Sequence, residues 1–172
     1  MKPVLENVCP RFAVPILLLL ISLILATTAL SDELMAARVV GVSDGDNITV
    51  LTPINKQVLI RLYGIDCPEE GQAFGVEAKQ FTSGQCFGMT IQYRLMGIDR
   101  FDRTIAKVFL EDGRELNLEI LKAGFAWHFE RYSKRQDYVD AEAEARKAGV
   151  GLWADPDPTP PWDWRREGRS KP

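Results

Sequence analysis

Asn47-Ile-Thr-Val-Leu51 and Gln57-Val-Leu-Ile-Arg-Leu-Tyr63 are two β-rich runs, joined by the turn Pro53-Ile-Asn-Lys56. Residues of high β propensity fill both runs, and proline at the start of the connection fits a turn. Side chains of the second run alternate between two faces, which is the period of a strand. Arg61 is the charged member of that run, so its face must open to solvent or to a ligand.

Further runs extend the pattern in both directions along the chain. Strands are predicted at Arg38–Val42, Thr90–Leu95 and Thr104–Leu110. Helices are predicted at Gln72–Gln85, Leu116–Ala123 and Asp137–Ala148, the last two ending at glycines. Five short strands with helices inserted late indicate an α+β, mainly β fold. We expect a five-stranded OB-type β-barrel with three packed helices.

Polar side chains gather at the ends of these runs. The carboxylates and arginines concerned are Asp44, Asp46, Arg61, Asp66, Glu69 and Arg103. Carboxylates can hold a hard cation, and the planar fork of arginine suits a phosphate. The combination predicts metal-assisted cleavage of a phosphodiester.

Each of these motifs also has a purely structural interpretation. Asp44-Gly-Asp46 alone is an ordinary turn, and Asp66-Cys-Pro-Glu69 could cap the helix that follows. A lone Arg61 or Arg103 is usually part of a solvated face. The functional interpretation depends on all of them occurring together.

The N-terminal segment differs in composition from the rest of the chain. An almost unbroken apolar run covers residues 12–26, with Lys2 and Arg11 before it and Ala29-Leu-Ser31 after it. This layout predicts a signal peptide over residues 1–31, although an uncleaved membrane anchor over residues 12–30 is the alternative. We therefore expect an exported protein, periplasmic or secreted, whose domain covers residues 32–154. A membrane is a partner only if the segment stays attached.

The net charge and the few histidines and cysteines limit the kinds of nucleic-acid and metal binding that this chain can have. The chain has a formal charge of −3, and losing residues 1–31, with two basic side chains and one acidic, leaves −4. A nonspecific nucleic-acid coat needs a basic surface, whereas a nuclease needs only a positive site. With His128 as the single histidine and few thiols, a zinc site is disfavoured. Cys67 and Cys86 could form a disulfide in an exported protein or stay as separate buried thiols.

The last segment, residues 155–172, is predicted to be a Pro/Trp-rich tail. Its start, Asp155-Pro-Asp-Pro-Thr-Pro-Pro161, cannot form the interior of a helix or a sheet. Trp162 and Trp164 are expected to cover an apolar patch. Arg165 and Arg166 next to them offer a weaker nucleic-acid contact.

Several motifs together resemble the staphylococcal nuclease family. They appear in the family's order and cover residues 38–153. The matching pieces are Ser43–Asn47, Arg61–Glu69, Phe74–Ala78, Asp99–Arg103, Leu121–Ala126 and Gly151–Trp153. The family's OB-type barrel with three helices agrees with the strand count obtained independently.

The resemblance implies a role for each polar residue. Asp46, Asp66 and the main-chain carbonyl of Cys67 would bind Ca²⁺, with Asp44 near the ion through water. Glu69 would activate water, and Arg61 and Arg103 would bind the phosphate. Tyr132 would flank the nucleotide, on a looser alignment.

This sequence departs from the family pattern at three places. Cys67 replaces a threonine and Phe101 replaces a tyrosine, so two hydroxyl groups are missing. The stretch between Glu70 and Phe74 is shorter than the flexible loop of the best-known member. These differences affect details of the substrate loop more than the chemistry.

The sequence therefore predicts a calcium-dependent endonuclease, a monomer with no protein partner inferred. By resemblance it would hydrolyse DNA and RNA at the 5′-oxygen side and leave 3′-phosphates. The main alternative is a noncatalytic nucleic-acid-binding or interaction module on the same barrel. A membrane-anchored interaction domain that uses the tail as its contact is a further alternative.

Overall fold

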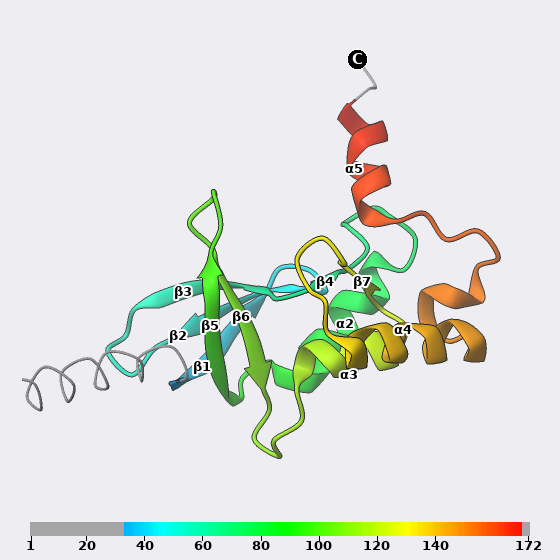
Figure 1. Cartoon of the computed structure of the whole chain (residues 1–172). Helices are drawn as coiled ribbons and strands as arrows, with labels where there is room; N and C mark the ends of the chain where they lie inside the picture. Colours follow the sequence, from blue (N-terminus) through cyan, green and yellow to red (C-terminus); the bar gives the residue numbers. More distant parts are fainter. Residues whose placement is uncertain (1–32, 170–172) are drawn as a thin grey trace, which may run out of the picture. The chain divides into compact units, whose positions relative to one another are not determined.

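Five strands form a closed barrel in which neighbours follow the order β1-β2-β3-β6-β5 (Figure 1). The computed structural model describes residues 33–169. The barrel strands are β1 Leu34–Val42, β2 Asn47–Leu51, β3 Gln57–Leu62, β5 Thr90–Ile98 and β6 Thr104–Phe109. The predicted five-stranded, mainly β barrel is confirmed.

The strand register brings three chain segments to one end of the barrel. β2 pairs with β3 antiparallel, with Asn47 opposite Arg61. β3 pairs with β6 in parallel, with Ile60 opposite Thr104, and this pairing helps to close the barrel. The start of β2, the end of β3 and the start of β6 therefore lie next to one another.

A second, two-stranded sheet lies outside the barrel. It pairs β4 Ile65–Asp66 with β7 Trp127–His128, so that Asp66 lies opposite Trp127. The sequence did not predict these strands, because two residues are too few to show a period. The short sheet fixes the backbone of Asp66 directly after the turn that leaves the barrel.

The three predicted helices are present as α2 Gly75–Cys86, α3 Leu116–Lys122 and α4 Gln136–Ala148. A 3₁₀ turn, η2 Gly151–Ala154, and a further helix, α5 Pro161–Arg169, follow them. The core joins apolar side chains of the barrel to those of the helices. Its largest fully buried members include Ile48, Ile60, Leu62, Ile91, Leu116, Ile120, Leu121 and Tyr138.

Strands β1 and β5 are longer than predicted, since β1 begins at Leu34 instead of Arg38 and β5 ends at Ile98 instead of Leu95. Two larger differences concern the helices. The first long helix begins at Gly75 instead of Gln72, because turns occupy the preceding residues and Phe74 has a positive φ of 64°. Residues 155–172 were predicted as a Pro/Trp-rich tail outside the three expected helices, but α5 lies within it and is the fourth α-helix of residues 33–169. Proline is compatible with the first turn of a helix, which explains how α5 begins at Pro161.

The predicted signal peptide and its cleavage before Asp32 lie outside the described residues. Within residues 33–169, no helix has the length and apolar character needed to cross a membrane.

Candidate active site

Arg61 lies between two buried aspartates. Its guanidinium pairs with Asp46 through Nη1, and its Nη2 donates to Asp66 Oδ1 at 2.5 Å. The side chains of Asp46 and Asp66 are 2% and 0% exposed, and that of Arg61 is 15% exposed. One cationic group therefore satisfies two carboxylates that converge on the same point.

The loop before β2 aims Asp46 into this cluster. The carboxylate of Asp44 accepts hydrogen bonds from the backbone N–H groups of Asp46 and Asn47 at 3.0 and 2.8 Å. A Cβ at Gly45 would lie 2.6 Å from the Cβ of Cys67, so glycine allows the loop to pack there. Asp46 Oδ2 then accepts a 2.7 Å hydrogen bond from the Cys67 N–H, which links the two acidic segments.

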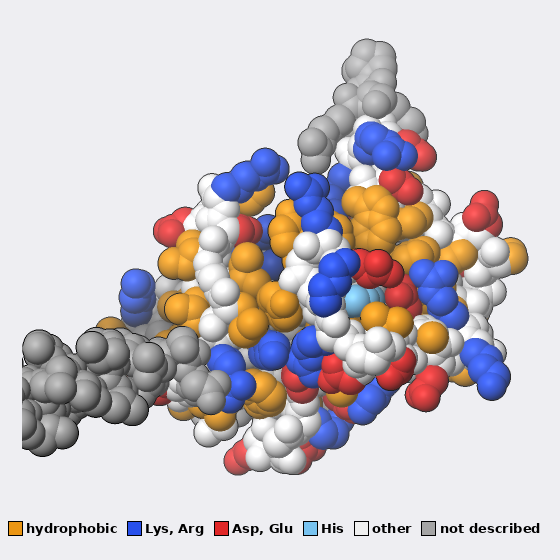
Figure 2. Space-filling view, in the orientation of Figure 1, with side chains coloured by type: hydrophobic (Ala, Val, Ile, Leu, Met, Phe, Trp, Pro, Cys, Tyr) orange, Lys and Arg blue, Asp and Glu red, His pale blue; other side chains and the backbone are white. Residues whose placement is uncertain are grey.

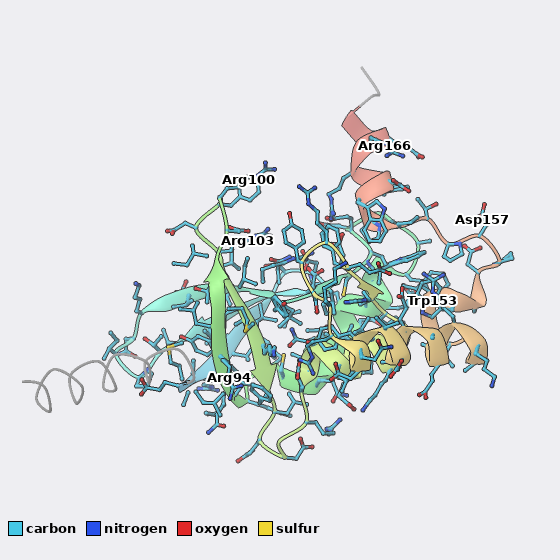
Figure 3. The ribbon with its side chains drawn as sticks, in the orientation of Figure 1. Arg94, Arg100, Arg103, Trp153, Asp157 and Arg166 are labelled. Carbon is cyan, nitrogen blue, oxygen red and sulfur yellow. The ribbon has the colours of Figure 1, made fainter. Side chains whose placement is uncertain are left out.

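Asn47 connects Arg103 to the buried carboxylates. Its Nδ2 donates to Asp46 Oδ1 at 2.9 Å, and its Oδ1 accepts from Arg103 Nη1 at 2.9 Å. Arg103 precedes β6 at the end of the β5–β6 hairpin, where Figure 3 labels it. The arginine is thus held beside the site indirectly, through an amide.

Asp99 orients Arg103 from the other side. It accepts from the guanidinium Nε at 2.7 Å and from the backbone N–H groups of Phe101 and Arg103 at 2.8 and 3.0 Å. Slight burial works against the charged form of Asp99, but the hydrogen bonds from Arg103 and Phe101 hold its pKa below the usual value. Asp99 therefore stays ionised and keeps the guanidinium in place.

Glu69 lies at the edge of the cluster, on a backbone that is tightly enclosed. Its N–H donates to Gln72 Oε1 at 3.0 Å. A Cβ at Gly75 would lie 2.1 Å from the Glu69 carbonyl oxygen, so only glycine allows this approach at the start of α2. The Glu69 side chain is 34% exposed, while the neighbouring Glu70 is more open to solvent.

The arrangement combines buried carboxylates, two arginines and one partly exposed carboxylate at the end of a small barrel. Comparison with known proteins finds the family model described as staphylococcal nuclease homologue, matching residues 59–155. The chain belongs to the staphylococcal nuclease family.

Two bacterial relatives of this nuclease family match over most of the chain. An uncharacterized endonuclease of Haemophilus influenzae is 41% identical, covering 87% of this chain and 85% of the relative. A micrococcal nuclease of Shigella flexneri is 35% identical, covering 86% of this chain and 89% of the relative. A probable staphylococcal-like nuclease of rice is 36% identical over 64% of this chain and 30% of the plant protein.

The structure therefore brings together most of the nuclease-site residues expected from the sequence. Asp46, Asp66 and Arg61 are in direct contact, and Arg103 joins them through Asn47. Both carboxylate oxygens of Asp44 hold Asn47, so its expected water-mediated contact with an ion stays a prediction.

Tyr132, the remaining candidate, lies on the surface. It is 57% exposed, and its ring packs edge-on against Phe129 with centroids 4.8 Å apart. The role proposed for it beside a nucleotide stays a prediction.

Cys67 and Cys86 are free, buried thiols, which agrees with the second of the two alternatives considered. Burial raises the pKa of Cys67 well above its usual range, although Arg61 opposes this effect. Burial raises the pKa of Cys86 to about 12. Both thiols therefore stay protonated near neutral pH, which is unfavourable for a thiolate metal ligand.

His128 is buried in β7 and packs edge-on against Tyr138 at a centroid distance of 5.9 Å. The imidazole ring therefore contributes to packing within the fold.

One cationic residue of the site was not predicted. Arg165 of α5 pairs with Asp66 and Glu69, although it is 99 residues from Asp66 in the chain. Burial alone would lower the pKa of Arg165, but hydrogen bonds and charge from Asp66 and Glu69 raise it. The sequence signal that could have indicated this contact is the Trp-Asp-Trp-Arg spacing, which places Trp162 and Arg165 near one face of a helix.

Asn47→Ala should disturb both stability and activity in this nuclease fold. The variant loses the buried amide that links Asp46 to Arg103, and an unsatisfied buried group typically costs about 1–3 kcal/mol. The free energy of unfolding in urea and the cleavage rate of the folded protein should both decrease.

Asn117→Ala is the matched control for Asn47→Ala. Asn117 is also buried and bonds to the backbone of Val108, Tyr63 and Ala106 instead of to the carboxylate cluster. It should lose stability and keep its cleavage rate. Equal rates in the two variants would contradict a role for Asn47 in placing Arg103.

Proposed function

We propose that this protein is an exported, calcium-dependent nuclease that hydrolyses phosphodiester bonds in DNA and RNA. The observation that carries the proposal is the convergence of buried Asp46 and Asp66 on one cationic group, with Glu69 at the edge. Membership of the staphylococcal nuclease family and the endonuclease relatives support a nuclease. The surface of Figure 2 interleaves basic and acidic side chains, which suits a local positive site better than a basic coat.

The side chains of the cluster fit a hard divalent cation. Ca²⁺ prefers carboxylate, carbonyl and water oxygens, and two buried carboxylates already converge on a positive group. Residues 33–169 hold no group of three or more His, Cys, Asp or Glu side chains suited to a metal ion. The proposed site therefore uses only two side chains, Asp46 and Asp66. The resemblance to the family adds the carbonyl oxygen of Cys67, and water would complete the shell.

The reaction follows from the remaining side chains. When bound, Ca²⁺ supplies charge neutralisation at the phosphate. Glu69 accepts a proton from the attacking water or orients it, and the water oxygen forms the new bond to phosphorus. The bond between phosphorus and the 5′-oxygen of the next nucleotide breaks, the 5′-oxygen takes up a proton from solvent, and a 3′-phosphate remains. Arg61 and Arg103 donate hydrogen bonds to the nonbridging oxygens as negative charge accumulates on them.

Asp46→Asn tests the metal assignment. The variant keeps the shape of the side chain and loses one buried charge, so we expect Ca²⁺ affinity to fall at least about tenfold, or ~1.4 kcal/mol. Calorimetric titration with CaCl₂ and cleavage of denatured DNA measure the two effects, and circular dichroism checks the fold. Asp112→Asn, at an exposed position, is the control.

Wild-type protein tested in parallel decides the function itself. Cleavage of single-stranded DNA that needs calcium and stops in EDTA is the expected result. Binding without cleavage under every divalent ion would favour the noncatalytic module. Full activity of Asp46→Asn in EDTA would contradict the metal site.

Export is proposed from the N-terminal sequence alone. The chain recovered from the periplasm or medium should begin near Asp32, as N-terminal sequencing can determine. Recovery of a membrane-bound chain that still begins at Met1 would favour the anchor instead.

A further inference from the structure

The C-terminal helix α5 is attached next to the carboxylate cluster by aromatic contacts. Trp162 stacks on Phe129 with centroids 5.4 Å apart and meets Trp127 edge-on at 5.6 Å. The backbone of Trp127 pairs with Asp66 across the β4–β7 sheet. Trp127 therefore links the base of α5 to Asp66, a proposed metal ligand, because its ring contacts Trp162 and its backbone pairs with Asp66.

A polar contact attaches the segment before α5 to the backbone of Glu69. Gln72 Nε2 donates to the carbonyl oxygen of Thr159 at 2.6 Å, and its Oε1 accepts from the Glu69 N–H at 3.0 Å. One glutamine thus joins the tail and the segment that carries the proposed water-activating group. The aromatic contacts and the Gln72 hydrogen bonds together fix the position of α5 relative to Asp66 and Glu69.

Arg165 reaches the cluster from this anchored helix. Its Nη2 donates to Asp66 Oδ2 at 2.7 Å, and its Nη1 pairs with Glu69 Oε1 and lies 3.2 Å from Asp66 Oδ1. The Arg165 side chain is 31% exposed. A single planar guanidinium therefore spans two carboxylates that would otherwise repel each other.

We propose that Arg165 is a positioning residue of the nuclease site, which ties the Glu69 carboxylate to Asp66 at a fixed separation. This inference rests on the proposed function. It adds a requirement for the C-terminal segment, because Glu69 depends on a group delivered by residues 155–169. The nuclease site then contains three arginines with two different tasks.

The division of oxygen atoms favours a positioning role over competition with the ion. Arg61 joins Oδ1 of Asp46 to Oδ1 of Asp66, and this is the side on which the two carboxylates converge. The shorter contact of Arg165 with Asp66 is on the opposite oxygen, Oδ2. Asp46 and Asp66 would hold a cation on the Oδ1 side, in place of their contacts with Arg61 and of the longer 3.2 Å contact of Arg165. The contacts of Arg165 with Oδ2 of Asp66 and with Glu69 would not compete with that cation.

Arg166 provides a matched control on the same helix, where Figure 3 labels it. Its side chain is 76% exposed and pairs with Asp163 at 3.0 Å. Substituting either arginine by alanine removes the same charge from the same element. Only the variant at Arg165 removes the contact with Glu69.

The first test compares the kinetics of full-length wild type, Arg165→Ala, Arg165→Lys and Arg166→Ala. We expect kcat to fall about 10–100-fold in both Arg165 variants, because outer partners of a metal site typically have this effect, while KM changes little. Lysine keeps the charge but cannot span two carboxylates with a planar fork. Arg166→Ala should keep kcat within about twofold of wild type, because its exposed side chain does not touch the carboxylates, and loss of a weak nucleic-acid contact there would change KM.

Free guanidinium ion separates positioning from a general loss of structure. Millimolar guanidinium should restore part of kcat to Arg165→Ala, and ammonium should not. Thermal unfolding of each variant checks that the fold is retained. Equal kcat values in Arg165→Ala and Arg166→Ala, with an active wild type, would overturn the inference and leave the proposed function intact. Inactivity of the wild type would instead count against the proposed function.

A second readout needs no variant and no activity. A crystal structure of the wild-type protein grown with CaCl₂ should retain the contacts of Arg165 with Asp66 Oδ2 and Glu69. Displacement of Arg165 from both carboxylates by the bound ion would overturn the positioning role and identify the tail as a competitor of the metal.

Discussion

Glu69→Gln is expected to lower turnover by roughly 10²–10⁴, the usual range for a lost acid–base group, while calcium and nucleic-acid binding persist. Glutamine keeps an oxygen that can accept the hydrogen bond from Arg165, so the local structure should survive. What is lost is the basicity of the carboxylate. The short path Asp66-Cys-Pro-Glu69 holds that carboxylate beside the buried aspartates, with Pro68 restricting the backbone.

Single-turnover cleavage of denatured DNA at saturating calcium measures this effect, with Glu70→Gln as the control. Glu70 is the adjacent carboxylate and belongs to the exposed class. The Glu70→Gln variant should therefore cleave at the wild-type rate. If turnover fell in Glu70→Gln and stayed normal in Glu69→Gln, the assignment of Glu69 as the water-activating carboxylate would be wrong.

Arg61→Lys is expected to reduce transition-state stabilisation by ~2 kcal/mol or more, even though the charge is kept. In the structure the two terminal nitrogens of Arg61 pair with different aspartates, Asp46 and Asp66. A lysine ammonium is a compact point charge that cannot reproduce this fork. The same loss of geometry should weaken the contact with a phosphate.

The ratio kcat/KM at saturating calcium provides the measurement, with Arg103→Lys in parallel and Arg38→Lys as the control. Arg38 lies in the same barrel and donates to the carbonyl oxygen of Gly88, at an exposed position. The Arg38→Lys variant should cleave at the wild-type rate. If Arg61→Lys and Arg103→Lys both cleaved like wild type, neither arginine would belong to the site.

Alternation along the chain was sufficient to place the barrel strands. β2 has the predicted bounds, and β3 ends one residue earlier than predicted. Ile60 and Leu62 are buried in the core, as the alternation requires. β4 and β7 were missed, since their pairing depends on contacts between distant segments. Helix α2 begins later than predicted because Glu69 and Gln72 form turns that have no periodic signal.

Residue type and order placed Asp46, Asp66 and Arg61 near one another. The register of β2 with β3 brings Asp46 to Arg61, and Asp66 follows in β4, only five residues after Arg61. Asn47 was not recognised, because an asparagine in a turn is usually explained by local hydrogen bonding. Arg165 was not recognised as part of the site either, since the proline-rich segment before it indicated a tail outside the domain, and the arginine was expected only as a weak nucleic-acid contact. Its position depends on Trp162 meeting side chains far away in the sequence.

The pairing of Asp66 with Arg165 across 99 residues has a consequence for the order of events as the protein folds. An exported chain reaches its folding compartment with its N-terminal side first, so the barrel strands are available before α5. A chain that has delivered the barrel and not yet residue 165 would have its acidic residues in place without their last partner. Maturation of the site would then occur only when α5 has followed.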